Sequence, residues 1–93
     1  MIVVRNVFVA KPGQASKLAA QFKAASTAFD VPHRVLTDLT GEFNRVILEY
    51  EVENAAGFEA VLKDYATNEK LRSALAGYTD LCISGHRELL QTA

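Results

Sequence analysis

The sequence predicts an α+β domain in which helices cover one face of a four-stranded antiparallel sheet. Three observations predict it. The chain has 93 residues, 49% of them apolar, so residues 1–93 suffice for a single domain with one core. Four segments have the strand-like composition or alternation of a β-structure, and two have the period of a helix. They follow one another in the order β-α-β-β-α-β, with a short extra helix before the last strand.

The first half of the chain contains one strand and one helix. Residues 2–10 are rich in β-branched side chains and form the strand. Lys11-Pro12-Gly13 ends it, because proline has no amide hydrogen to donate to a neighbouring strand. Residues 14–29 form an amphipathic helix, and Pro32 excludes its continuation. The apolar stripe of this helix consists of Leu18, Phe22, Ala25 and Phe29.

The middle of the chain forms a hairpin. Residues 33–40 alternate, with Val35, Thr37 and Leu39 on one face, and residues 45–52 resume the same alternation. The connection between them, Gly41-Glu42-Phe43-Asn44, has the composition of a turn.

The last part of the chain contains a helix, a short helix and a strand. Asn54 is the expected N-cap of the first of these helices, and Asn68 that of the second, which Gly77 ends. Residues 81–90 form the last strand, in which Leu81, Ile83 and Leu89 oppose a polar row. The apolar stripe of the longer helix consists of Phe58, Val61, Leu62 and Tyr65.

Right-handed crossovers place both longer helices on the same face of the sheet, which is the ferredoxin-like βαββαβ fold. The strands, however, are apolar on both of their faces. In the first strand Val4 and Phe8 lie on one face and Val3 and Val7 on the other. Since an exposed apolar face usually marks an interface, we expect a homodimer that pairs through the sheet face. The alternative is a monomer with a mildly apolar face.

Composition excludes several classes of partner. Ten Lys and Arg residues against eleven Asp and Glu residues leave no basic excess for nucleic acid or for an anionic membrane surface. No apolar run approaches the roughly 20 residues that span a bilayer. Cys82 is the only cysteine, which excludes an internal disulfide and indicates a reducing, cytoplasmic compartment. No metal-binding or nucleotide-binding motif is present, so we expect no metal and no cofactor.

Four stretches spread over essentially the whole chain resemble a known family. They are Lys11-Pro12-Gly13, Gly41-Glu42-Phe43-Asn44-Arg45-Val46, the passage from Tyr50-Glu51-Val52 to Ala56-Gly57-Phe58-Glu59, and Ser84-Gly85-His86-Arg87-Glu88-Leu89-Leu90. The chain thereby resembles the dimeric α+β barrel superfamily and, within it, the NIPSNAP-like family. It departs from the family in the first strand, where Asn6 and Phe8 replace a frequent arginine and tyrosine.

The resemblance implies a homodimer whose two sheets form a barrel, with a pocket in each protomer. The wider superfamily includes cofactor-independent monooxygenases, haem-degrading enzymes, isomerases and stress-inducible proteins. NIPSNAP-like members are mostly without an assigned reaction, and a fold alone does not settle a function.

His86 is the candidate catalytic residue. It shares a strand face with Glu88, and if that face lines the barrel, the imidazole can act as a general base or bind a ligand. The alternative is a hydrogen-bonded histidine at the solvated end of the strand. We expect His33, which follows Pro32, to be a surface turn residue. Cys82 is expected to be a small buried side chain rather than a nucleophile.

Arg5 and Glu49 are candidate ligand-binding residues, together with Asn6 and Phe8. Arg5 interrupts a strand of valines, so it must reach a carboxylate, an anionic ligand or water. Glu49 and Glu51 lie on one strand face and can form an acid–base pair. The alternative is charge pairing of these carboxylates with Arg5, Arg34 or Arg45 on neighbouring strands.

Two functions remain open at this point. The first is a small-molecule-binding barrel protein with a pocket lined by residues such as Asn6, Phe8, Glu49 and His86, whose implied chemistry is cofactor-independent oxygenation or isomerisation of a small apolar substrate. The second is a non-catalytic homodimeric module whose sheet face is fully occupied by its partner, with no pocket. A weaker third is a subunit of a larger assembly with another protein.

Overall fold

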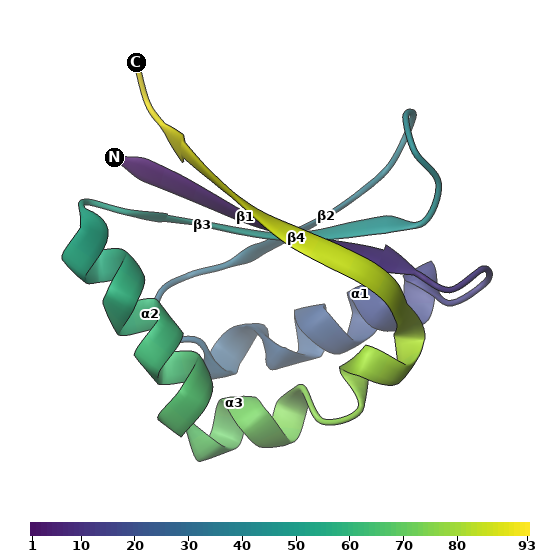
Figure 1. Ribbon diagram of the computed structural model, residues 1–93. Helices are drawn as coiled ribbons and strands as arrows, with labels where there is room; N and C mark the ends of the chain where they lie inside the picture. Colours follow the sequence, from purple (N-terminus) through teal and green to yellow (C-terminus); the bar gives the residue numbers. More distant parts are fainter.

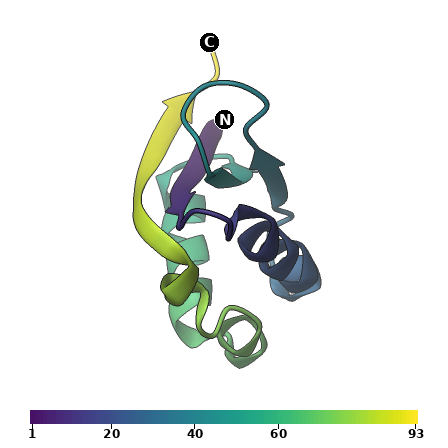
Figure 2. The same ribbon diagram turned by 90° about the vertical axis from the view of Figure 1, so that its right-hand side faces the viewer.

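Four antiparallel strands form one sheet in the order β2-β3-β1-β4, and all the helices lie on one side of it (Figures 1 and 2). The computed structural model describes residues 1–93 and confirms the predicted ferredoxin-like fold. Its strands and helices are β1 (Ile2–Ala10), α1 (Ala15–Ala24), β2 (Arg34–Thr37), β3 (Arg45–Val52), α2 (Ala55–Thr67), α3 (Glu69–Ala74) and β4 (Cys82–Gln91), with 3-10 turns at Ala25–Ala28 and Tyr78–Leu81.

The core lies between the sheet and the helices. Even-numbered residues of β1 and β3 face the helices and meet the predicted helix stripes, so that Leu18 and Phe22 of α1 are fully buried. Each such side chain contributes roughly 1.5–3 kcal/mol on burial. The residues buried in this layer are Val4, Ala10, Leu18, Phe22, Ala25, Ala28, Phe29, Val46, Leu48, Tyr50, Val52, Val61 and Leu71.

Local signals set the ends of the helices as predicted. The Asn54 side chain accepts a hydrogen bond from the Gly57 amide at 3.0 Å and begins α2. The Asn68 side chain accepts from the Leu71 amide at 3.1 Å and begins α3. Gly77 has a φ of 81°, a left-handed conformation that favours glycine and ends the helical segment.

Three predicted details are wrong. The helix expected over 14–29 is α-helical only to Ala24 and continues as a 3-10 turn. β2 ends at Thr37 and not at residue 40, because the Asp38 carboxylate accepts hydrogen bonds from the Arg45 amide at 3.1 Å and its Nε at 2.9 Å. Leu39 is therefore not on a strand face but fully exposed. Ile83, predicted to lie on the apolar face of the last strand with Leu81 and Leu89, instead sits at a register shift between β4 and β1 and is exposed.

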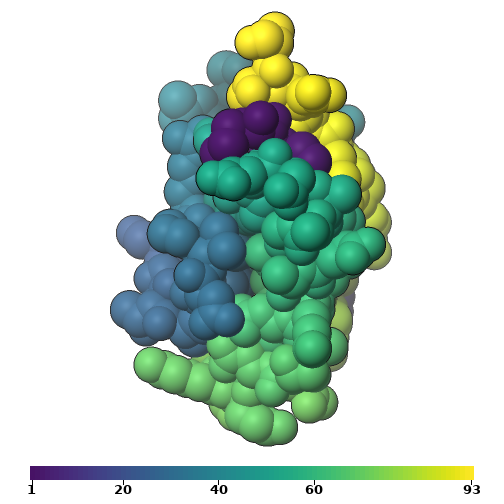
Figure 3. Space-filling model, turned by 90° about the vertical axis from the view of Figure 1, so that its left-hand side faces the viewer, coloured from purple at the N-terminus to yellow at the C-terminus, as the bar shows by residue number.

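The two ends of the chain lie together. The Thr92 amide donates to the Met1 carbonyl at 3.1 Å, and Ile2 pairs with both Val52 and Gln91. On the surface, the first residues lie between the end of the chain and the segment that joins β3 to α2 (Figure 3). No helix of the protein has the length and apolar character needed to cross a bilayer.

Candidate functional site

The main pocket lies on the helix side of the sheet, between β1, β4 and the helices. We call it the inner pocket; its volume is about 510 Å³. Seven of its twelve lining residues are hydrophobic. It is lined by Asn6, Phe8, Phe22, Phe29, Leu48, Tyr65, Arg72, Leu75, Tyr78, Gly85, His86 and Arg87.

An aromatic cluster forms one wall of the inner pocket. The ring of Phe8 lies 5.0 Å from that of Phe22 and 5.6 Å from that of Tyr78, edge-on to the latter. Phe8 comes from β1, Phe22 from α1 and Tyr78 from the turn before β4, so three separate elements build this wall. Its rings are tilted against one another by 52–85° and offer an apolar surface.

A continuous line of hydrogen bonds forms another wall; we call it the polar chain. Arg87 Nε donates to Asn6 Oδ1 at 2.7 Å, and Asn6 Nδ2 donates to the Tyr65 hydroxyl at 3.3 Å. The same hydroxyl lies 2.8 Å from His33 Nε2, and His33 Nδ1 lies 2.6 Å from the Val31 carbonyl oxygen. The polar chain thus crosses the protein from β4 to the residues before β2.

The partners of the polar chain fix its direction. The Val31 carbonyl can only accept, so His33 Nδ1 carries a proton and, in the neutral ring, Nε2 accepts from the Tyr65 hydroxyl. Arginine can only donate, so the oxygen of the Asn6 amide faces Arg87 and its nitrogen faces Tyr65. Every donor therefore points from Arg87 toward Val31.

Burial disfavours the charged forms of both His33 and Tyr65 in the polar chain. The His33 ring stacks on Phe29 at 3.8 Å and on Tyr50 at 4.4 Å. Burial lowers the pKa of His33, although the Val31 carbonyl and Asp64 act in the opposite direction. Burial likewise raises the pKa of Tyr65. The prediction that His33 is a surface turn residue is wrong, because its ring fills the space between two aromatic side chains.

The predicted site residues separate onto the two faces of the sheet. Asn6 and Phe8 line the inner pocket, as does His86, although the His86 side chain is largely exposed. Arg5 and Glu49 lie on the opposite face, which we call the open face because no helix covers it. The sequence predicted a pocket lined by Asn6, Phe8, Glu49 and His86; the inner pocket contains all of these except Glu49.

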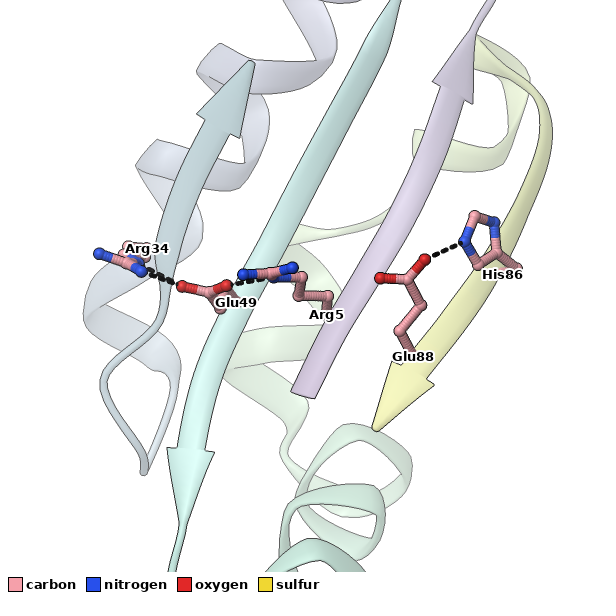
Figure 4. A network of polar contacts seen from close by, with 5 residues as sticks. All are labelled: Arg5, Arg34, Glu49, His86 and Glu88. Atoms are coloured by element: carbon pink, nitrogen blue, oxygen red, sulfur yellow. Dashed lines mark hydrogen bonds and ion pairs between the residues drawn. The ribbon is translucent and has the colours of Figure 1, made fainter. Parts of the chain in front are cut away.

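A row of alternating charge crosses the open face (Figure 4). Arg34, Glu49, Arg5 and Glu88 are neighbours in register on β2, β3, β1 and β4. Glu49, which is 3% exposed, accepts from Arg5 Nε and from Arg34 Nε, both at 2.5 Å. The hydrogen bond from Arg5 is the main reason that the pKa of Glu49 is lowered. Glu49 thus makes the ion pairs with Arg5 and Arg34 that the charge-pairing alternative describes.

His86 makes its contact on the open face. Its Nε2 lies 3.0 Å from Glu88 Oε2, and both side chains are about half exposed. Cys82 is half-buried, and burial raises the pKa of its thiol. No group of three or more His, Cys, Asp or Glu side chains is arranged to hold a metal ion.

Sequence reasoning missed Tyr65, Arg87 and His33 as site residues. One signal could have found part of the set. Asn6 is polar on the core-facing side of β1, and Arg87 is polar on the otherwise apolar side of β4 that adjoins it. Asn6 is 6% exposed and needs a hydrogen-bonding partner, which the exposed Arg87 on the neighbouring strand can supply.

A second hollow, of about 780 Å³, lies between α1 and the β2–β3 hairpin. Its lining is polar and largely exposed, and includes Ser16, Lys23, Thr37 and Asp38. It lacks the enclosed apolar surface that small-molecule sites use, so the inner pocket is the candidate site.

Solved structures with the same fold are NIPSNAP proteins and a monooxygenase. A NIPSNAP domain protein from Burkholderia xenovorans superposes with a TM-score of 0.84 at 13% identity, covering 100% of this chain and 95% of that one. A NIPSNAP family protein from Agrobacterium tumefaciens has a TM-score of 0.83 at 11% identity, with 99% and 92% covered. An antibiotic biosynthesis monooxygenase has a TM-score of 0.72 at 11% identity, with 100% and 99% covered.

No protein-family model matches this chain, and no curated protein matches it in sequence. The likeness to NIPSNAP proteins, which the sequence motifs indicated, is therefore confirmed as a likeness of fold.

Proposed function

We propose that the protein binds a small, largely apolar molecule in the inner pocket. The pocket itself carries this proposal, since its volume of about 510 Å³ and its mostly hydrophobic lining match the sites of small organic molecules, which span roughly 300–1,000 Å³. The polar chain gives it a few fixed polar groups, which such sites use to orient a ligand.

The chemistry that suits this site is proton transfer or cofactor-independent oxidation of the bound molecule. The Tyr65 hydroxyl has a proton acceptor beside it in His33, and Asn6 and Arg87 supply donors for an oxygen that becomes negative during a reaction. The fold is shared with an antibiotic biosynthesis monooxygenase, which supports oxidation as one of the two.

We infer further that the protein works as a homodimer joined through the open face. This face carries Arg5, Arg34 and Arg45 against Glu49, Glu51 and Glu88, so its charges cancel and can complement a second copy turned by 180°. Apolar side chains lie between them, among them Val3, Val7, Leu36, Ile47 and Leu90.

The loop between β2 and β3 strengthens the case for a second copy. It rises on the side of the sheet away from the helices (Figures 1 and 2). Leu39 at its start is fully exposed, and Phe43 near its end is 87% exposed. Two large apolar side chains in that position favour contact with a partner that covers the open face.

The homodimer and the pocket do not compete for the same surface. The inner pocket lies on the helix side of the sheet, so a partner on the open face would leave it available. This arrangement favours a ligand-binding protein over the alternative of a homodimeric module without a pocket.

A neutral aromatic probe tests the ligand-binding proposal. We expect 2-naphthamide, titrated into ¹⁵N-labelled protein, to shift the amide signals of residues that line the inner pocket. Leu75→Trp should abolish these shifts, because Leu75 lines the pocket and the larger side chain fills it. Ala66→Trp, on the exposed surface of α2, is the matched control and should bind like the original protein. Absence of pocket shifts, or equal binding by Leu75→Trp, would contradict the proposal.

A further inference from the structure

We propose that the ligand of the inner pocket is an organic anion, with a flat apolar body and a carboxylate or similar oxyanion that Arg87 binds. The inference rests on the proposed ligand-binding function and adds the class of ligand. Three observations carry it: the charge of the lining, the unused donors of the polar chain and the aromatic wall.

The lining of the inner pocket carries positive charge and no carboxylate. Arg72 and Arg87 both line it, and none of the lining residues is Asp or Glu. Two carboxylates contact lining residues from outside the pocket: Glu88 contacts His86 on the open face, and Glu69 lies 3.7 Å from Arg72 on the exposed surface of α3. A concave site of one sign concentrates ligands of the opposite charge.

Arg87 differs from the other arginines in having no carboxylate partner. Arg5 and Arg34 pair with Glu49, Arg45 pairs with Asp38, and Arg72 lies near Glu69. Arg87 uses only its Nε, which donates to Asn6, and its guanidinium lies over the Phe58 ring, 5.6 Å from the ring centroid. The group is held from two sides while both terminal nitrogens are left without a partner in the protein. Arginine in this state binds a carboxylate through two parallel hydrogen bonds.

Asn6 leaves a second donor unused. It is 6% exposed and lines the pocket. Its oxygen accepts from Arg87 and one amide hydrogen goes to Tyr65, so the other amide hydrogen has no partner. The Tyr65 hydrogen is directed to His33. Asn6 and Arg87, which both line the pocket, therefore keep free N–H donors that an acceptor such as an oxyanion can use.

The aromatic wall fits the other end of such a molecule. The rings of Phe8, Phe22 and Tyr78 lie within 6 Å of one another and present an apolar surface opposite the polar chain. Flat ligands bind such a surface by stacking or edge contacts. A ring system on this wall with its anionic group at Arg87 uses both halves of the lining.

Two probes of the same shape and different charge test the inference. The probes are 2-naphthoate and 2-naphthamide, titrated separately into ¹⁵N-labelled protein at pH 7 and low salt. We expect the carboxylate to bind at least about tenfold more tightly than the amide, which is about 1.4 kcal/mol. Arg87→Met should abolish this preference, and the methionine chain keeps the apolar contact with Phe58.

Two further variants distinguish a specific role of Arg87 from the effect of overall positive charge and from a loss of folding. Lys63→Met removes an exposed positive charge of α2 that does not line the pocket, and should keep the preference. Arg87→Lys retains the charge and should restore part of it. Equal binding of both probes to the original protein would overturn the anion inference alone. A preference that survives Arg87→Met would overturn the role of Arg87. If neither probe shifts pocket signals, the ligand-binding proposal itself is contradicted.

Discussion

Glu49 shows how one carboxylate organises the open face. It lies on β3 between two arginines and is almost fully buried, while Arg5 and Arg34 remain partly exposed. A buried carboxylate is stable only while it is paired, because the unpaired charge has lost its hydration. Its neighbour Glu51 is exposed and has no such partners.

We predict that Glu49→Gln lowers the free energy of unfolding by about 1–3 kcal/mol, because two charge-assisted hydrogen bonds weaken; the partial exposure of both arginines keeps the value in this range. Urea denaturation at pH 7 measures it. Glu51→Gln is the control, with a change of less than about 0.5 kcal/mol. Equal effects of the two substitutions would show that the pairing of Glu49 contributes nothing.

His33 gives the protein a specific dependence on pH. Burial lowers its folded pKa below the ordinary value near 6.5. Between these two pKa values the unfolded chain binds more protons than the folded one, so stability rises with pH across that window and falls on acidification. The pairing of Glu49 acts in the same direction at lower pH, below the ordinary carboxyl range.

We predict that lowering the pH from 7 to 5 reduces the urea midpoint, and that His33→Phe reduces this pH dependence. Phenylalanine preserves the stacking on Phe29 and Tyr50 without a titrating group. His86→Gln is the control and should keep the pH dependence. In the original protein at pH 7, ¹⁵N spectra should show a neutral His33 ring protonated at Nδ1; a charged ring or the other tautomer would contradict the direction given to the polar chain.

At the scale of elements, Asn68 joins three segments of the chain. Its oxygen begins α3 by accepting from Leu71, while its amide nitrogen donates to the Ala28 carbonyl at 2.9 Å and to Asp64 of α2 at 3.0 Å. Asn54 makes only the capping hydrogen bond at the start of α2. The two asparagines therefore share a capping role but differ in long-range contacts.

We predict that Asn68→Ala is more destabilising than Asn54→Ala. The loss of one cap is worth about 1 kcal/mol, and Asn68→Ala also leaves the Ala28 carbonyl without its donor. Thermal or urea unfolding of the two variants measures the difference. Equal losses would mean that the contact with Ala28 adds nothing to the cap.

The sequence predicts elements well where one local pattern decides them. The stripe of Leu18 and Phe22, the cap at Asn54 and the left-handed turn at Gly77 were all found this way. The prediction fails where a side-chain contact outside the strand pattern intervenes, as when Arg45 binds Asp38, seven residues away, and β2 ends early. The prediction of the candidate site was limited for another reason. Because β1 is apolar on both faces, its alternation does not show which face meets the helices, and therefore not that Asn6 faces the pocket and Arg5 the open face.

At the scale of the whole molecule, the proposed homodimer depends on the open face and the loop above it. The charges of that face cancel, and its exposed apolar residues include Leu39 and Phe43 on the loop. Neither side chain contributes to the core of the protomer. Their substitution should therefore affect association and not folding.

We predict that the combined substitution Leu39→Ser and Phe43→Ser raises the dissociation constant of the homodimer at least about tenfold, since it removes two large apolar contacts. Sedimentation equilibrium measures the dissociation constant. The urea midpoint, extrapolated to protein concentrations at which only monomer is present, should be unchanged and so show that the fold is intact. Ala66→Ser, on exposed α2, is the control. A monomeric mass for the original protein would contradict the homodimer.

The central position of β1 has a consequence for how the chain folds. Arg5 pairs with Glu49, 44 residues away, and Asn6 contacts Arg87, 81 residues away. β1 is thus completed on one side only when β3 has been made, and on the other only when β4 has been made. Closing the long loops that such distant pairings require costs entropy before the contacts form, so folding is expected to be slow for a chain of this size.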